Sequence, residues 1–358
     1  MATSLLNMTQ RQTGWIGVDV GTSHLKVVQL AGGPHRPRLA AVAIVPRSAA
    51  WNTTELTEDQ ALSTAGELGA AFSLRPDFRG RRVAAALPMS VCQIHQFDRS
   101  LSRGSHRDRA VLQALEAASQ SPVGHLQFAA WPAELDAQRT APVKTNVLAV
   151  PQAWSDQLCE DIAQTGWSCQ LIDGMPWALA RAVEMVHDGD RETPWAALDW
   201  GHSQATFCVV AEGRPAYVRS LKDCSLRQLF HSIMEELMVT EDEALRLVQE
   251  YGLSGNEPTE VSKVIEELVA EPLDKLQQEL ARTLSHIKGQ RRTIVPQGVY
   301  LFGGGATLKG LAAHLTEKLD LDHRVWQLSD AGSTSNPHHV PHTCVLGPAA
   351  ALSALAWE

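Results

Sequence analysis

One short segment near the start of the sequence combines a carboxylate, a glycine turn, two hydroxyls and a lysine. We call residues 19–26 loop 1, and its polar and glycine positions are Asp19, Gly21, Thr22, Ser23 and Lys26. Glycine lets a backbone approach an anion closely, and free N–H groups and hydroxyls can hold phosphate oxygens. Asp19 could bind Mg²⁺ through water, because Mg²⁺ gives up its hydration reluctantly. Loop 1 therefore predicts a site for phosphate and magnesium, with Lys26 neutralising the phosphate.

A second segment repeats this pattern 180 residues later. Loop 2, residues 199–206, contains Asp199, Gly201 and Ser203 and again follows an apolar run. The alternative is a pair of ordinary β-turns that use Asp and Gly. One Asp-x-Gly has no predictive value, but two, each at the end of an apparent buried strand and before a hairpin, favour a paired phosphate site. Asp199 is then the second candidate ligand of Mg²⁺.

A third segment, loop 3, consists of Gly303, Gly304 and Gly305 between an apolar run and an amphipathic stretch. Three glycines allow a flat ligand to lie on bare backbone, and the N-terminus of a following helix favours negative charge. The alternative is a simple strand-to-helix turn. Together with the other two loops, the pattern favours a nucleotide site.

The elements that must position these loops alternate between strands and helices. Apolar runs bounded by Gly and Pro predict strands at residues 15–20, 25–30, 39–45, 83–87, 195–200, 205–211, 216–221 and 298–302. Apolar spacing of three and four predicts helices at residues 58–72, 155–165, 176–187, 259–287, 308–319 and 347–357. The helix at 259–287 is expected to be kinked or split at Pro272. Residues 91–150 read as an inserted α/β subdomain, with strands at 92–97, 126–131 and 146–150 and a helix at 109–118.

Composition excludes several classes of protein. The chain has 358 residues and a formal net charge of −9, which argues against a general nucleic-acid binder. No apolar run is long enough for a membrane-spanning helix, and the first residues lack a secretory signal, so we expect a cytoplasmic protein without direct membrane insertion. The six cysteines form no CxxC pair, as in a reduced compartment. His338, His339 and His342 lie in a Ser/Pro-rich stretch and are expected in a loop.

The order of these features resembles the actin, sugar-kinase and heat-shock-70 ATPase superfamily. The chain is most similar to the PilM family of type IV pilus assembly proteins, which is related to the division protein FtsA. The resemblance rests on GVDVGTSHLKVVQL, RVAAALP, LIDGMPWALARAV, ALDWGHSQATFCVVAEGRPAYVRSL, EDEALRLVQEYG and VYLFGGGATLKGLAAHLTEKL. It runs from about Gly14 to Ala356 and is weakest in the insert.

The resemblance implies an α/β protein of two lobes, in the actin-like, duplicated ribonuclease H-like fold. Residues 14–90 and 151–194 would form subdomain 1A, with residues 91–150 inserted as subdomain 1C. Residues 195–345 would form the second lobe, and residues 346–358 a helix packed back on the first lobe.

The resemblance also implies ATP with Mg²⁺ in the cleft between the lobes. Loops 1 and 2 would hold the phosphates and loop 3 the adenosine. The sequence departs from the usual family pattern at His24, Trp200, Gln204 and Ala205. We find no residue that could orient a water for hydrolysis, so we expect at most a weak ATPase.

In function, the resemblance implies a scaffold that binds the N-terminal tail of a PilN-like membrane protein and so lies at the inner membrane. Contacts with PilO and pilus motor ATPases would be indirect. The strands at 83–87 and 92–97 flank the insert and are the expected docking surface, with Ala85 as a probe if exposed. One alternative is a small-molecule kinase with Asp173 as base. Another is an FtsA-like division protein, although the chain stops at Glu358 without a membrane-targeting helix.

Overall fold

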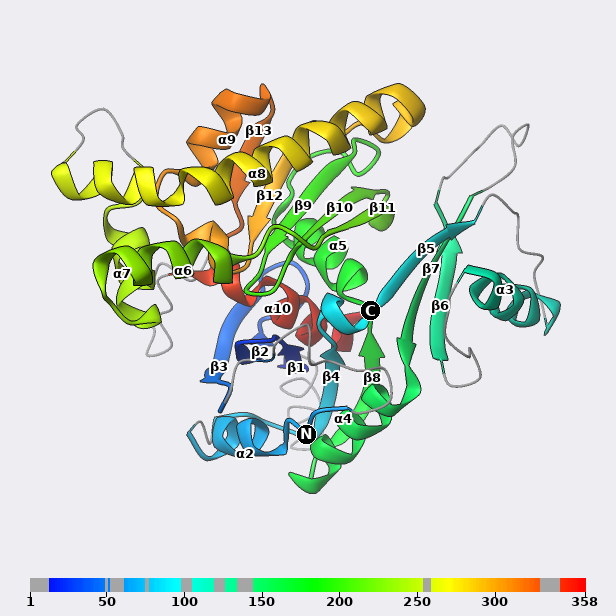
Figure 1. Cartoon of the computed structure of the whole chain (residues 1–358). Coiled ribbons are helices and arrows are strands. Elements are labelled where there is room, and N and C mark those ends of the chain that lie inside the picture. Colours follow the sequence, from blue (N-terminus) through cyan, green and yellow to red (C-terminus); the bar gives the residue numbers. More distant parts are fainter. Residues whose placement is uncertain are drawn as a thin grey trace.

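The computed structural model describes residues 13–48, 51, 61–74, 77–97, 105–118, 126–133, 144–253, 259–328 and 342–358. Two five-stranded sheets and one three-stranded sheet form the framework. In Figure 1 the two larger sheets lie one above the other, and the third projects to one side. Two lobes and an insert therefore organise the described part of the chain.

The first lobe is built on a sheet with the order β3-β2-β1-β4-β8. Strands β1 to β3 are antiparallel, whereas β4 and β8 run parallel to β1. The strands are β1 (Thr13–Val20), β2 (His24–Ala31), β3 (Arg38–Pro46), β4 (Arg82–Ala86) and β8 (Ser168–Asp173). The predicted strands of this half are confirmed, and the edge strand β8 is an addition that its mixed polarity concealed.

The second lobe repeats this sheet with the order β11-β10-β9-β12-β13. Its strands are β9 (Trp195–Trp200), β10 (Ala205–Ala211), β11 (Arg214–Leu221), β12 (Gly298–Phe302) and β13 (Asp322–Val325). Asp19 of β1 lies opposite Lys26 of β2, and Asp199 of β9 lies opposite Thr206 of β10. The two carboxylates thus occupy the same position in two copies of one sheet.

Two helices fill the space between the sheets. They are α5 (Met175–Val186) and α10 (Gly347–Ala354), the latter continuing as a 3-10 turn (Leu355–Trp357). One buried cluster joins both helices to the facing sides of both sheets. At Gly17 of β1 a Cβ would lie 1.9 Å from the carbonyl oxygen of Ala349, so α10 packs directly on the strand backbone.

The outer faces of the sheets are covered by other helices. On the first sheet these are α2 (Ala65–Leu74) and α4 (Gln152–Gln164). On the second sheet they are α6 (Leu226–Leu237), α7 (Glu241–Glu250), α8 (Glu260–Gln290) and α9 (Leu311–Leu319). Each lobe is therefore a layered α/β unit with its own core.

The insert forms a third sheet with the order β5-β7-β6. Its elements are β5 (Gln93–Phe97), α3 (Ser105–Ala118), β6 (Leu126–Pro132) and β7 (Thr145–Pro151). Val111 and Leu115 of α3 pack on β7. The insert also contacts the second lobe, because the Trp131 indole donates a hydrogen bond of 2.6 Å to the carbonyl of Pro215 in β11.

Three sequence-based boundaries were wrong. Helix α2 begins at Ala65, since residues 61–64 are not helical and residues 58–60 lie outside the described part. Helix α8 is a single element of 31 residues, so the predicted split at Pro272 is wrong, while a kink there stays a prediction. Buried Ile265 and Val269 before the proline and buried leucines after it hold the helix against the core. Helix α9 begins at Leu311, after a 3-10 turn at Gly304–Thr307.

Other expectations stay predictions. His338 and His339 lie outside the described residues. The limits of the five segments predicted from sequence (14–90, 91–150, 151–194, 195–345 and 346–358) are not set by the sheets alone. Among the described residues, no helix is long and apolar enough to cross a membrane.

Candidate functional site

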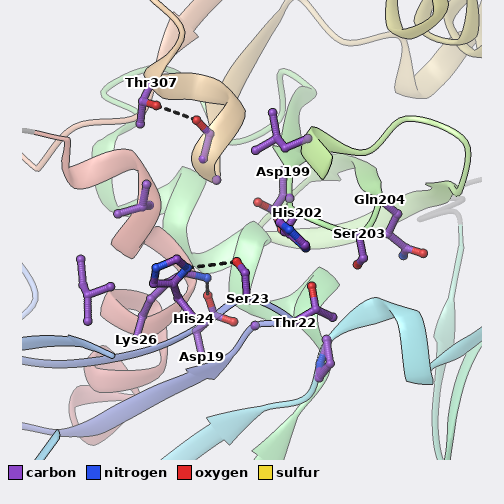
Figure 2. Close-up of a pocket in the computed structure, with 18 of the residues that line it drawn as sticks. Asp19, Thr22, Ser23, His24, Lys26, Asp199, His202, Ser203, Gln204 and Thr307 are labelled. Carbon is purple, nitrogen blue, oxygen red and sulfur yellow. Dashed lines mark hydrogen bonds and ion pairs between the residues drawn. The ribbon is translucent and has the colours of Figure 1, made fainter. Parts of the chain in front are cut away.

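A cavity of about 310 Å³ lies between the lobes and is lined by residues of both. In Figure 2 the labelled side chains of loop 1 lie below those of loop 2 across this space. Ten of the residues predicted from sequence line the cavity: Asp19, Gly21, Thr22, Ser23, Lys26, Asp199, Gly201, Ser203, Gly303 and Gly304. The structure thus brings together three segments that are far apart in the chain.

Loops 1 and 2 have the same backbone turn. The amide of Gly21 donates to the carbonyl of His24 at 3.1 Å. In the same way, the amide of Gly201 donates to the carbonyl of Gln204 at 3.0 Å. The next carbonyls of loop 2, those of Gly201 and His202, accept hydrogen bonds of 3.1 Å from the first amides of α6. Because C=O and N–H point in opposite directions across a trans peptide, the amides that follow them are free to meet an anion.

Asp19 and Lys26 form an ion pair on the floor of the cavity. Lys26 Nζ lies 2.8 Å from Asp19 Oδ2, and the Asp19 side chain is only 5% exposed. Burial alone would lower the pKa of Lys26, but the charge and hydrogen bond of Asp19, together with the charge of Asp199, raise it overall. Lys26 is therefore a fixed positive charge beside two carboxylates.

Asp199 is a buried carboxylate whose charged form is disfavoured by its surroundings. Burial first, and the charge of Asp19 second, raise the pKa of Asp199 to about 6, while Lys26 acts in the opposite direction. A cation placed between the carboxylates would relieve this repulsion.

This pKa predicts a pH dependence of stability. The pKa of Asp199 rises from 3.8 to about 6 on folding. The folded state therefore binds more protons than the unfolded state between those values, and the free energy of unfolding falls as pH rises through this window. Asp199→Asn should remove this contribution. With chelator present, the melting temperature of the wild type relative to that of the variant should decrease between about pH 4.5 and 7. Parallel pH profiles for the two proteins would contradict the prediction.

The donor set is compatible with Mg²⁺ but not with an all-protein metal cage. The described residues contain no group of three or more His, Cys, Asp or Glu side chains able to hold a metal ion. Mg²⁺ usually keeps several waters and binds one or two carboxylates plus substrate phosphates. Asp19 and Asp199 match that mode, because both line the same cavity from opposite lobes.

The structure adds a rim of titratable groups that sequence reasoning missed. His24 of loop 1 and His202 of loop 2 line the cavity together with Glu241 and Asp242, which lie in the first turn of α7. His202 Nε2 lies 3.5 Å from Glu241 Oε1, and the hydrogen bond between them lowers the pKa of Glu241. Burial lowers the pKa of His24. The turn positions of the two histidines were visible in the sequence, but nothing there placed α7 over them.

Loop 3 divides into a lining part and a packing part. Gly303 has φ +78°, and a Cβ at this position would lie 2.4 Å from Asp199 Oδ1, so the close approach requires glycine. A Cβ at Gly305 would instead lie 2.6 Å from the indole of the buried Trp200, and Gly305 is not among the lining residues. Its binding role remains a prediction.

The expected helix N-terminus behind loop 3 is not at the cavity. A 3-10 turn separates loop 3 from α9, and a Cβ at Gly310, the residue before α9, would lie 3.2 Å from Leu253. The cavity wall here is formed instead by polar side chains, since Gln249 donates to Thr307 at 3.3 Å and Thr307 donates to the Gly304 carbonyl at 2.7 Å.

Asp173, the candidate kinase base, does not line the cavity. It forms an ion pair with Arg181 and accepts a hydrogen bond of 2.9 Å from the amide of Gly174 at the start of α5. Asp173 therefore helps to fix the start of α5.

Comparison with known proteins gives a consistent fold. No family model matches the chain, and no curated protein matches it. A chain of the solved PilM–PilN type IV pilus biogenesis complex superposes with a TM-score of 0.77 at 22% identity, covering 96% of this chain and 99% of that one. The ethanolamine utilization protein EutJ from Carboxydothermus hydrogenoformans gives 0.54 at 15% identity, over 95% and 89% of the chains.

The chain has the actin-like fold. MreB5 of Spiroplasma citri bound to AMPPNP gives a TM-score of 0.49 at 11% identity, over 94% of each chain. The matches to the PilM–PilN complex chain and to EutJ confirm the fold class predicted from the sequence, and the sheet order shows the duplication and the insert in the first lobe.

Proposed function

We propose that this protein is an actin-like, ATP-binding scaffold of a type IV pilus or related assembly machine. In this role it recruits a PilN-like inner-membrane protein by binding that protein's N-terminal tail. One observation carries the nucleotide part: two equivalent carboxylate hairpins, one from each lobe, close on a single cavity. The partner part is supported by the match over 96% of the chain to a structure that contains PilM and PilN.

The cavity offers complementary groups for Mg-ATP. Lys26 supplies a fixed positive charge, and the turns of loops 1 and 2 supply hydroxyls and amides for phosphate oxygens. Mg²⁺ would lie between Asp19 and Asp199 with water completing its coordination. Loop 3 would face the adenosine beside Gln249 and Thr307. The volume of about 310 Å³ is at the lower end for a ligand site, as expected of a hinged cleft that opens further.

Bound nucleotide would set the angle between the lobes, since its phosphates contact loops from both. We assign no described residue to activation of a water, so any ATPase activity is expected to be weak. The kinase alternative loses its base, because Asp173 is paired with Arg181 away from the cavity.

The docking surface expected from sequence is corrected at β4 only, whereas β5, an end strand of the third sheet among the described strands, stays a candidate. Strand β4 pairs with β1 on one side and β8 on the other, and Ala85 is fully buried, so β4 offers no free edge. Strand β8 is the end strand of the first sheet among the described strands, and its Leu171 is 38% exposed. The end of β8 touches the insert, because a Cβ at Gly174 would meet the Leu148 side chain of β7. We place the tail at the β8 edge facing the insert, where an extended peptide could pair with the strand.

A peptide experiment tests this proposal. A synthetic peptide of about 15 residues from the N-terminus of the PilN-like protein of the same organism should bind the wild type in fluorescence polarisation. Leu171→Glu should weaken binding by about tenfold or more, because it places a charge where an apolar side chain of the tail would pack.

Met238→Glu is the matched control, since Met238 is 88% exposed on the second lobe and should not affect the peptide. Equal affinity of the wild type and the Leu171→Glu protein would show that the tail docks elsewhere.

The remaining partners follow from this one. PilO and pilus motor ATPases would be reached only through the membrane protein, and the scaffold would lie on the cytoplasmic side of the inner membrane. An FtsA-like division role has no separate support among the described residues.

A further inference from the structure

Three consecutive carbonyls of loop 1 accept hydrogen bonds from residues that follow β3. The Arg47 Nε donates to the Gly21 carbonyl at 3.1 Å. The Trp51 amide donates to the Thr22 carbonyl at 2.7 Å, and the Arg47 amide donates to the Ser23 carbonyl at 2.8 Å. The backbone of loop 1 is therefore held at every residue of its turn.

These hydrogen bonds orient the opposite side of the peptide units. Arg47 and Trp51 are not among the residues that line the cavity, whereas Thr22 and Ser23 are. In a trans peptide, N–H points away from the preceding carbonyl, so fixing the carbonyls outward turns the amides of Thr22 and Ser23 inward. Successive inward amides form a concavity that suits an anion.

The donating side chain is enclosed, although only its Nε, and neither Nη, has a hydrogen-bond partner among the described residues. The side chain of Arg47 is fully buried, its guanidinium lies 3.7 Å from the centre of the Trp51 ring, and Glu67 Oε2 of α2 lies 3.7 Å from Nη1. Burial lowers the pKa of Arg47 to about 10, so the group remains charged near neutral pH. A buried charge is costly to desolvate, which makes a purely passive packing role a poor explanation for an arginine here.

Helix α4 anchors both residues. Trp51 packs edge-on against Trp154 of α4, with ring centres 5.3 Å apart. Asp161 of α4 accepts hydrogen bonds from the amide and hydroxyl of Thr64 at 2.5 and 3.0 Å, which fixes the start of α2 and with it Glu67. Trp51 thus packs on α4 directly, and Arg47 is connected to α4 through α2.

We propose that Arg47 and Trp51 form a clamp that positions loop 1 for phosphate, although neither residue touches the ligand. The inference rests on the proposed nucleotide binding and adds positioning residues to it. Loss of the clamp frees the carbonyls of loop 1 to rotate toward the cavity, where they repel phosphate oxygens. The clamp therefore acts on the phosphate part of a ligand and leaves the nucleoside part unaffected.

The test compares ligands with and without phosphates. Affinities for Mg-ATP, Mg-pyrophosphate and adenosine are measured by calorimetry on the full chain. Arg47→Lys keeps the charge but loses the fixed Nε donor. It should weaken Mg-ATP and Mg-pyrophosphate by about tenfold or more, as for loss of a charge-assisted hydrogen bond, and leave adenosine unchanged.

Arg82→Lys is the matched control, because Arg82 is exposed at the start of β4 and does not line the cavity, and it should bind all three ligands as the wild type does. If Arg47→Lys does not fold, Trp51→Phe should show a smaller loss of the same selectivity. An equal loss for all three ligands, or no loss in either clamp variant, overturns the inference. Failure of the wild type to bind Mg-ATP would instead refute the proposed function.

Discussion

Asp19→Ala and Asp199→Ala should each abolish the thermal stabilisation that Mg-ATP gives to the wild type. A ligand that binds only the folded state stabilises it by about 2.7 kcal/mol at a hundredfold excess over its Kd. Both carboxylates line the cavity, and the charge of Asp19 contributes to the raised pKa of Asp199. Removing either one leaves Mg²⁺ a single protein ligand.

Without ligand, the Asp19→Ala and Asp199→Ala proteins should differ in melting temperature. Asp19→Ala leaves the buried Lys26 without its partner at 2.8 Å, so the apoprotein should melt below the wild type. Asp199→Ala removes the carboxylate whose pKa is raised, and its apoprotein should be at least as stable as the wild type near pH 7.

Differential scanning fluorimetry with and without Mg-ATP measures both effects. Asp156→Ala on the exposed face of α4 serves as a control and should keep the full shift. If the shift persists in both cavity variants, the metal is not held between these carboxylates.

Gly17→Ala should destabilise the protein strongly, because the added methyl group would meet the backbone of α10. The added Cβ would lie 1.9 Å from the Ala349 carbonyl oxygen and 2.7 Å from the Ser353 amide nitrogen, and both are backbone atoms of α10. Neither can move without shifting the helix off the first sheet. Overpacking of a core usually costs about 1–3 kcal/mol, and a clash with backbone should reach or exceed the upper value.

Urea unfolding followed by far-ultraviolet circular dichroism measures this change. Gly69→Ala is the matched control, because Gly69 lies within α2 and a Cβ there meets nothing within 4 Å. Alanine is the better helix former, so the control should gain up to about 1 kcal/mol. An unchanged urea midpoint for Gly17→Ala would mean that α10 does not pack on β1 this closely.

The sequence predicted the hairpins at the site because they are local. A turn that pairs residue 21 with residue 24 necessarily places Asp19 opposite Lys26. The ion pair could therefore be predicted from the register of the hairpin. The equivalent turn in loop 2 places Asp199 opposite Thr206 by the same rule.

The features of the fold and site that the sequence did not predict depend on contacts between distant segments. Nothing in the spacing of Arg47 and Trp51 indicates that both bind the backbone of loop 1. Gly305 looked like a third ligand-facing glycine, but it packs against Trp200. Strand β8 has no fully buried side chain and lacks the apolar run that marks a buried strand. Each of these features is set by tertiary packing, which overrides local pattern.

The packing of α10 also has a consequence for the order in which the chain folds. The Ser353 hydroxyl donates to the Trp15 carbonyl at 2.5 Å and accepts from the Leu30 amide at 2.9 Å, across sequence separations of 338 and 323 residues. During synthesis from the N-terminus, one face of β1 and β2 therefore stays uncovered until residues 347–354 leave the ribosome. The facing side of the second sheet packs against α5, which precedes its strands in the chain, so part of that side is covered before α10 is synthesised. Contacts this distant close slowly, so the lobe that begins the chain should be the last to reach its native packing.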